Sequence, residues 1–244
     1  MTHINLSGRV ALITGASRGI GAVVAKAYAQ AGAHVVLLAR TVGALEALDD
    51  KIRAAGGQAT LIPMDLRDPE PLDNLGPLLM QKFGRLDIFV ANAGMLGTLT
   101  PLPHQKAGEW EKVMNVNLNA NFRLVRTLDP VLRASDAGRA IFVTSSAAEG
   151  RAYWGAYGIS KAALEALART WASETEKTKL RVNMIDPGGI RTAMRAEAFP
   201  GEDKEALPLP EEVVPAFLEL ASLGCVKHGE IVRFRESMKI RQAS

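Results

Sequence analysis

Seven short runs rich in apolar and β-branched residues recur along the chain, and segments with helical periodicity separate most of them. The runs span residues 9–14, 34–39, 58–64, 86–91, 139–144, 180–185 and 230–234. Strands that are apolar along nearly their whole length are typical of burial on both faces, and helical connections allow neighbouring strands to run parallel. The pattern therefore predicts an α/β fold: a single doubly wound domain with a seven-stranded parallel sheet and helices on both faces.

Composition and charge exclude several classes of protein. The chain has 244 residues and a net charge of +3, and its Lys and Arg residues are scattered, which argues against a nucleic-acid partner. Cys225 is the only cysteine, so an internal disulfide is excluded, and no Cys/His cluster suggests a metal site. No apolar stretch has the length of a membrane span or a signal sequence, so we expect a cytoplasmic protein without a membrane partner.

The first apolar run leads directly into a glycine-rich turn, TGASRGIG, at residues 14–21. Gly15, Gly19 and Gly21 allow the backbone to approach a pyrophosphate, and the N-terminus of the following helix offers free N–H groups and positive potential. Such turns also occur as plain connections, but the place of this one after the first of several parallel strands favours a dinucleotide.

The end of the second run indicates which dinucleotide binds. An acidic residue there would bind the ribose hydroxyls of NAD(H), but this chain has Ala39 followed by Arg40. Arg40 and Arg18, from the glycine turn, could instead bind the 2′-phosphate of NADP(H), which the sequence favours over NAD(H). Asp65, after the third run, is a candidate for hydrogen bonding to the adenine, and an N-cap of the next helix is the alternative.

Further motifs follow along the chain. They are NAG at 92–94, NVNL at 115–118, a serine at the end of the fifth run, YGISK at 157–161 and DPGGIRT at 186–192. Together with the glycine turn they span residues 10–194 and resemble the short-chain dehydrogenase/reductase family. The resemblance implies a single NAD(P)-binding Rossmann-fold domain over residues 1–244. It also implies an oxidoreductase that interconverts a ketone or aldehyde and an alcohol by hydride transfer.

The resemblance places the active site on Asn117, Ser145, Tyr157 and Lys161. Tyr157 and Lys161 are four residues apart and therefore share one helix face. Tyrosine has an unperturbed pKa of about 10, so we expect the charge of Lys161 to lower the pKa of Tyr157, the general acid and base. In the family's arrangement Lys161 also binds the nicotinamide ribose, and Ser145 donates a hydrogen bond to the substrate oxygen. Asn117 there holds a water that connects Lys161 to solvent.

Three neighbouring residues leave alternatives open. Ser146 follows Ser145 and could take its place, because the segment from the serine to the tyrosine is about one residue shorter than usual in the family. Asn115 points to a different helix face from Asn117 and is the weaker candidate. Asp186 stands where the family usually has a small or amide residue, and it either tunes the site or caps the next turn.

The cofactor contacts implied by the resemblance come from six segments of the chain. They are Gly15, Ser17, Arg18, Gly19, Ile20, Gly21, Arg40, Asp65, Leu66, Asn92, Ala93, Gly94, Tyr157, Lys161, Pro187, Gly188, Ile190 and Thr192. Asn92 is also expected to stabilise the central strand, and the segment 187–192 to lie against the nicotinamide carboxamide.

Residues 194–212 are the expected substrate loop. Met194, Phe199 and Leu207 offer apolar contacts, and Arg191 or Arg195 is available for an anionic group. The expected partners are a small-molecule carbonyl or alcohol substrate and, from the family, further copies of the chain in a homodimer or homotetramer. The C-terminus has a basic tail in place of the family's usual ending. The alternative function is a non-catalytic dinucleotide-binding or redox-sensing protein on the same fold.

Overall fold

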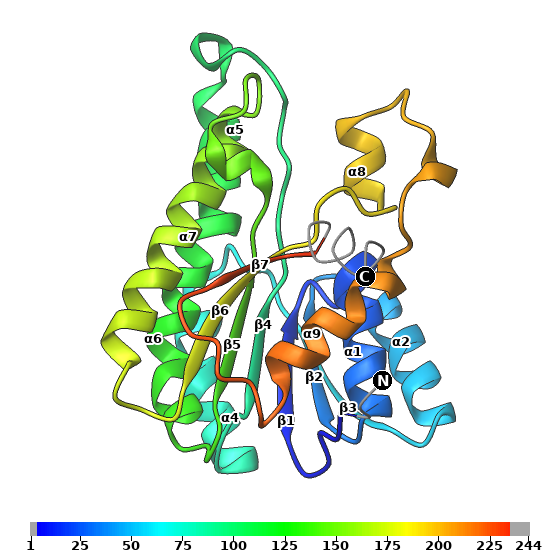
Figure 1. Cartoon of the computed structure of the whole chain (residues 1–244), viewed down its shortest axis with the longest axis vertical. Coiled ribbons are helices and arrows are strands. Elements are labelled where there is room, and N and C mark those ends of the chain that lie inside the picture. The colour runs from blue at the N-terminus through cyan, green and yellow to red at the C-terminus, as the bar shows by residue number, and fades with distance from the viewer. Residues whose placement is uncertain (1–3, 235–244) are drawn as a thin grey trace, which may run out of the picture.

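The computed structural model describes residues 4–234, and its core is one seven-stranded sheet in which neighbouring strands run parallel. The strands are β1 (Val10–Thr14), β2 (His34–Ala39), β3 (Gln58–Pro63), β4 (Ile88–Ala91), β5 (Arg139–Val143), β6 (Arg181–Asp186) and β7 (Ile231–Arg233). Their order in the sheet is β3-β2-β1-β4-β5-β6-β7 (Figure 1). The prediction of a doubly wound α/β fold is therefore confirmed.

The central strands are buried on both faces, which explains their continuous apolar sequences. All five residues of β1 and all five of β5 are buried. In β2, Val35, Val36 and Leu37 are completely buried although their side chains alternate between the two faces. The predicted and observed bounds of β2 are the same, whereas β7 is shorter than predicted.

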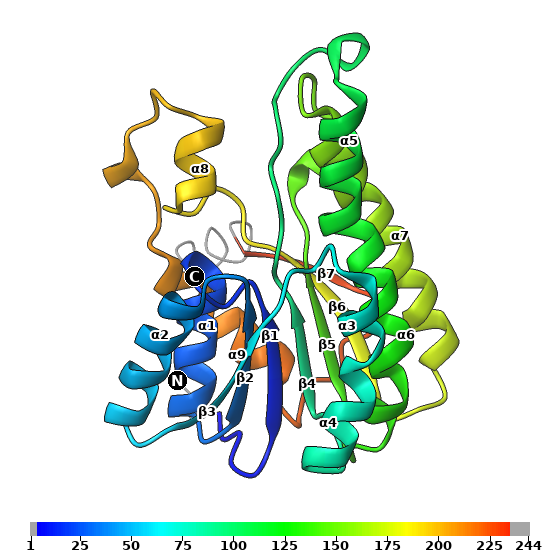
Figure 2. The same cartoon turned by 180° about the vertical axis from the view of Figure 1, so that it is seen from behind.

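Helices cover both faces of the sheet. They are α1 (Gly19–Gln30), α2 (Val42–Ala54), α3 (Pro69–Asp73), α4 (Leu75–Phe83), α5 (Ala107–Met114), α6 (Ala120–Arg133), α7 (Gly155–Thr175), α8 (Ala193–Ala198) and α9 (Val214–Ala221). On one face α1, α2 and α9 pack in one apolar cluster, and on the other α4, α6 and α7 pack in a second. Figures 1 and 2 show these two layers from opposite sides.

The chain reverses its direction of progress across the sheet between β1 and β4. From β1 it moves outward to β2 and β3, and then returns to β4 on the other side of β1. In open parallel sheets, ligands bind at this switch point, beyond the carboxyl ends of the strands. The predicted site residues follow the ends of β1, β4, β5 and β6, so the topology brings them to one edge. Above this edge α8 projects from one side and α5 from the other (Figures 1 and 2).

Within residues 4–234, no helix is both long and apolar enough to cross a membrane. The last part of the basic C-terminal tail, residues 235–244, lies outside the described residues. The role of the tail therefore stays a question for the sequence alone, whereas the structure describes the site at the strand ends.

Candidate active site

The glycine turn after β1 is closely packed on one side and open on the other. Gly15 and Gly19 have φ values of 65° and 56°, a conformation that favours glycine. A Cβ at Gly21 would lie 2.3 Å from the carbonyl oxygen of Gly15, whereas one at Gly19 would meet only the side chain of Thr192, at 3.6 Å. Arg18 occupies the N-cap of α1 without a side-chain hydrogen bond to the first turn, so N–H groups there remain available to a ligand.

Asn92 joins the ends of β4 and β1 at the switch point. Its Nδ2 donates to the carbonyl oxygens of Thr14 and Gly15, at 2.9 and 3.3 Å. In the opposite direction, the Thr14 hydroxyl accepts from the backbone N–H groups of Asn92 and Ala93, each at 3.1 Å. These four bonds fix the entry to the glycine turn against the end of β4.

Arg40 and Arg18 are both exposed near the open side of the turn. The Arg40 Nη1 lies 3.9 Å from Asp65 Oδ2, and the Arg40 side chain is 67% exposed. Arg67 donates to both oxygens of Asp65, and these hydrogen bonds lower the pKa of that carboxyl below its usual value. The N-cap alternative for Asp65 is wrong, because α3 begins at Pro69 with Asp68 at its N-cap.

The segment after β6 reaches across to the glycine turn. Asp186 Oδ1 accepts from the backbone N–H of Gly188 at 2.9 Å, so this carboxylate does cap the turn. Thr192 accepts from the N–H of Arg195 and caps α8, while its methyl group faces Gly19. The two segments therefore form opposite walls at the strand ends.

Tyr157 and Lys161 lie on the buried face of α7. Tyr157 is 8% exposed and Lys161 is 3% exposed. The Lys161 Nζ donates to the carbonyl oxygen of Val143 at 2.7 Å and lies 5.7 Å from the centre of the Tyr157 ring. A Cβ at Gly94 would be 3.7 Å from this Nζ. The pair thus lies beside the NAG segment that follows β4.

Burial moves the pKa values of this pair in opposite directions. It raises the pKa of Tyr157 to about 12, a hydrogen bond with Ser145 opposes this rise, and the charge of Asp186 adds to it. It lowers the pKa of Lys161 to about 8, and the charge of Asp186 opposes that fall. The expectation that the pKa of Tyr157 is lowered is therefore wrong for the protein without ligands, because the loss of hydration outweighs the hydrogen bond with Ser145.

Ser145, rather than Ser146, contacts Tyr157. The Ser145 hydroxyl accepts from the N–H of Ala147 at 3.2 Å, which caps a short 3-10 turn, and it also forms the hydrogen bond with Tyr157. Ser146 is exposed. The Ser145 hydroxyl therefore both caps the turn and contacts the phenol of Tyr157.

Asn117 lies in a π-helical stretch, Asn115–Asn119, and its side chain is completely buried. Its Oδ1 accepts from the N–H of Met95, and its Nδ2 donates to the Met95 carbonyl and to the Ser160 hydroxyl. Both N–H groups of the amide are therefore used. The Asn117 side chain therefore connects α7 to the segment after Gly94. The sequence did not predict this contact, because Ser160 had no assigned role within the YGISK motif.

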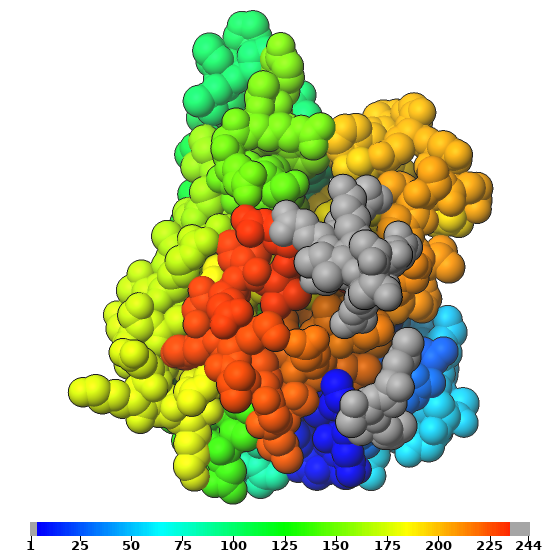
Figure 3. All heavy atoms as spheres, viewed as in Figure 1, coloured from blue at the N-terminus to red at the C-terminus, as the bar shows by residue number. Residues whose placement is uncertain are grey.

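An apolar cluster lies over Tyr157 and includes residues that the sequence analysis did not select. Leu96 and Ala147 pack with Tyr157, and partly buried side chains surround them: Leu99, Trp154, Met194 and Ala198. The Trp154 and Tyr157 rings are 5.6 Å apart. Trp154 could have been found from its place three residues before Tyr157, which puts both on one side of the helix. In the space-filling view, the start of α7 and the α8 segment meet above the strand ends (Figure 3).

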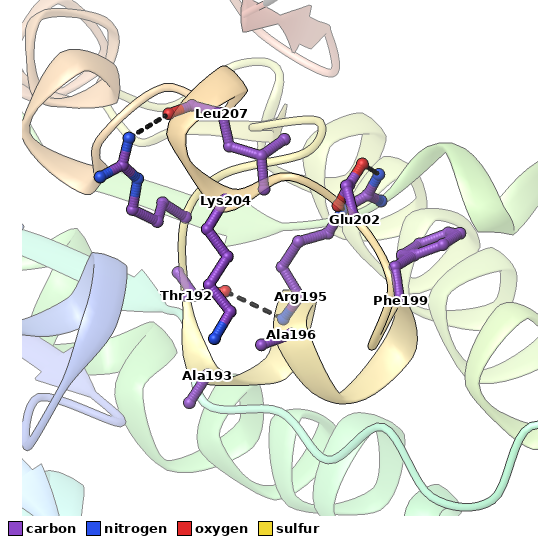
Figure 4. A pocket seen from close by; sticks show the side chains of 9 residues that line it. Thr192, Ala193, Arg195, Ala196, Phe199, Glu202, Lys204 and Leu207 are labelled. Atoms are coloured by element: carbon purple, nitrogen blue, oxygen red, sulfur yellow. Dashed lines mark hydrogen bonds and ion pairs between the residues drawn. The ribbon is translucent and has the colours of Figure 1, made fainter.

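The α8 segment lines an open pocket of about 290 Å³ (Figure 4). Arg195 pairs through two nitrogens with the carboxylate of Glu202, and Arg191 pairs with Glu205 at 3.0 Å. The two arginines predicted to be available for an anionic group are therefore both engaged by carboxylates of their own loop. Leu207 and Phe199 both line this pocket, and the Phe199 ring also packs against the Trp154 ring.

Comparison with known proteins identifies the family. Residues 9–203 match the family model described as short chain dehydrogenase. The uncharacterised oxidoreductase YciK of Escherichia coli K12 is 42% identical over 88% of this chain and 86% of its own length. The structure of E. coli YciK superposes with a TM-score of 0.92, at 40% identity, over 96% of this chain and 98% of that one.

A second solved structure carries a bound nucleotide. It comes from Shigella flexneri 2a, is assigned to the short chain dehydrogenases and is complexed with NADP. It is 39% identical, with a TM-score of 0.92, and the match covers 96% of this chain and 100% of that one. The sequence motifs, the parallel sheet and these matches agree: the chain belongs to the short-chain dehydrogenase family.

Proposed function

We propose that this protein is an NADP(H)-dependent oxidoreductase that interconverts a ketone or aldehyde and an alcohol. The observation that carries the proposal is the buried Tyr157 and Lys161 pair, with Ser145 bonded to the tyrosine, beside an open glycine turn at the same edge of the sheet. A buried acid/base pair next to a nucleotide cradle is the equipment that carbonyl reduction needs.

The residues at the strand ends fit a dinucleotide. The uncapped first turn of α1 and the open side of Gly19 would accept a pyrophosphate, and Arg18 and Arg40 would bind a 2′-phosphate. The Shigella flexneri relative complexed with NADP supports this choice. Gly94 leaves room beside Lys161, and the segment 187–192 would form the wall beside the nicotinamide. When bound, the nicotinamide supplies a hydride to the carbonyl carbon or takes one from the alcohol.

Tyr157 would move the proton. In reduction, the carbonyl oxygen gains the phenolic proton as the carbon–oxygen π bond opens, and Tyr157 is left as phenolate. With a pKa of about 12, Tyr157 holds this proton at neutral pH and is ready to act as the acid. Ser145 would hold the substrate oxygen, since its hydroxyl already bonds to the phenol. At neutral pH Tyr157 is therefore in the protonated form that carbonyl reduction uses.

Lys161 would stabilise the phenolate that reduction leaves behind. One of its three N–H groups donates to Val143, which leaves two for a ribose hydroxyl or a water. Asn117 would hold the surroundings of Lys161 in place, because its amide bonds to Met95 and Ser160. The roles of these residues, the substrate loop at 194–212, the homodimer or homotetramer and the cytoplasmic location stay predictions.

A screen of aldehydes and ketones tests the proposal. Purified protein is mixed with NADPH, the loss of NADPH absorbance is followed, and NADH is run in parallel. We expect turnover of at least one carbonyl compound, with NADPH preferred. Tight NADPH binding without turnover of any compound would favour the non-catalytic alternative, and a clear NADH preference would contradict the roles of Arg18 and Arg40.

A further inference from the structure

The side chains that pack around Tyr157 are apolar and come from three separate segments. Leu96 and Leu99 come from the chain after β4, Trp154 from the start of α7, and Met194 from α8. Side chains of this kind gain free energy when they cover apolar surface of a ligand. These side chains therefore favour a molecule with an apolar body around the carbonyl group that reaches Tyr157.

Arg151 lies at the rim of this apolar surface and is fixed by two aromatic rings. Its guanidinium carbon is 5.1 Å from the centre of the Trp154 ring and 5.2 Å from that of Phe199. The two rings are themselves 5.8 Å apart. Stacking on aromatic faces holds a guanidinium in place while leaving its N–H groups free to bond at the edge. Because the Trp154 ring also packs on Tyr157, the charge of Arg151 lies one ring away from the proposed acid.

The charge of Arg151 is not neutralised within residues 4–234. The other arginines near the rim are paired: Arg195 with Glu202, and Arg191 with Glu205. Glu149, two residues before Arg151, instead accepts from Arg233 at 3.1 Å. Arg151 has stacking contacts but no carboxylate partner in the described part of the chain. This arrangement leaves the Arg151 cation without a carboxylate partner beside the apolar side chains that cover Tyr157.

We propose that the substrate is a carbonyl compound with an apolar body and an anionic group, and that Arg151 binds the anion while the carbonyl reaches Tyr157. The inference rests on the proposed function and names the substrate class of the same site. A carboxylate suits the planar guanidinium, which can donate two parallel hydrogen bonds to it. The anion and the carbonyl would be separated by about the width of one aromatic ring, the ring of Trp154 that lies between Arg151 and Tyr157.

A pair of probes of nearly equal shape tests the inference. The first is 4-formylbenzoate, an aromatic aldehyde with a carboxylate across the ring, and the second is its uncharged methyl ester. We expect Arg151→Met, which keeps an unbranched side chain for packing, to lower kcat/KM for 4-formylbenzoate by roughly tenfold. For the ester, kcat/KM should change less than about twofold, and Arg151→Lys should restore part of the loss for the acid.

Arg126 supplies a matched control. It is also exposed and stacks on an aromatic ring, that of Phe122 at 5.7 Å, but it lies on α6 away from Tyr157. Arg126→Met should leave kcat/KM for both probes unchanged. An equal loss for Arg126→Met and Arg151→Met would mean that net charge, not a bound anion, sets the rate, and would overturn the inference.

The remaining outcomes separate this inference from the proposed function. If Arg151→Met affects both probes equally or neither, or if the wild-type protein reduces neutral carbonyls and neither reduces nor is inhibited by 4-formylbenzoate, the anion site is disproved and the proposed function stands. If none of the carbonyl compounds tested causes the wild-type protein to oxidise NADPH, the proposed function fails, and this inference fails with it.

Discussion

The ammonium of Lys161 lies 5.7 Å from the centre of the Tyr157 ring, and both side chains are buried. Burial without an ionised partner in hydrogen-bond contact favours the neutral form of each group. The tyrosine therefore keeps its proton far above neutrality, and the lysine loses its proton near pH 8. Below a pH of about 8, Tyr157 is therefore a neutral phenol and Lys161 a charged ammonium, which are the forms that a proton donor and its electrostatic partner need.

The rate of carbonyl reduction should fall as pH rises through about 8. Reduction needs the phenol form of Tyr157, which is present up to pH of about 12, and the charged form of Lys161, which is lost above about 8. We expect kcat/KM to be level on the acid side of this value and to fall by about tenfold per pH unit above it. The measurement is kcat/KM against pH with a neutral substrate. A level profile to pH 10 would show that the charge of Lys161 is not required.

Asp186→Asn should move that fall in kcat/KM to lower pH. The charge of Asp186 raises the pKa of Lys161, and asparagine removes the charge while keeping an oxygen to accept from the N–H of Gly188. In the variant, kcat/KM should therefore begin to fall at a lower pH than in the wild type. A fall at an unchanged or higher pH would mean that Asp186 only caps its turn.

Gly21→Ala should damage the cofactor cradle, because the added Cβ would lie 2.3 Å from the Gly15 carbonyl oxygen and 2.5 Å from Asn92 Nδ2. Overpacking of this kind costs about 1–3 kcal/mol, and movement of the turn should weaken NADPH binding by more than about tenfold. Gly43→Ala is the control, since no atom lies within 4 Å of its added Cβ. Thermal unfolding and NADPH titration of both variants measure the effect. Native values for Gly21→Ala would contradict the close packing of the turn.

Arg40→Ala should weaken the binding of NADPH and spare that of NADH. Because the variant loses a charge-assisted hydrogen bond from an exposed guanidinium to the 2′-phosphate, its affinity for NADPH should fall by roughly tenfold. Its affinity for NADH should not change, because NADH has no 2′-phosphate. Arg53, an exposed arginine that pairs with Asp49 on α2, provides the control through Arg53→Ala. Titration of each protein with both nucleotides decides: equal losses for NADPH and NADH would remove Arg40 from phosphate recognition.

Much of the fold could be predicted because burial on both faces leaves a strong pattern in the sequence. The run 34–39 coincides with β2, and the helical connections correctly indicated that neighbouring strands run parallel. The edge strand β7 was harder to predict, since its three residues are only partly buried or exposed. Motifs also indicated that Tyr157, Lys161 and Ser145 come together, because each follows or faces a strand end.

Contacts between distant segments could not be predicted in the same way. The pairing of Arg195 with Glu202 depends on how the α8 segment folds, and the stacking of Arg151 depends on Phe199, which is 48 residues away in the sequence. The pKa of Tyr157 was predicted in the wrong direction, because spacing on a helix gives proximity to Lys161 but not the depth of burial. These features depend on packing that a linear pattern does not encode.

The most direct test of the proposed chemistry is Tyr157→Phe. Phenylalanine keeps the ring that packs on Trp154 and removes only the hydroxyl that would donate the proton. With any carbonyl compound that the wild-type protein reduces, kcat should fall by at least roughly a hundredfold, while the affinity for NADPH in a direct titration stays within a few-fold of wild type. Undiminished turnover by Tyr157→Phe, with NADPH still bound, would contradict the assignment of Tyr157 as the acid.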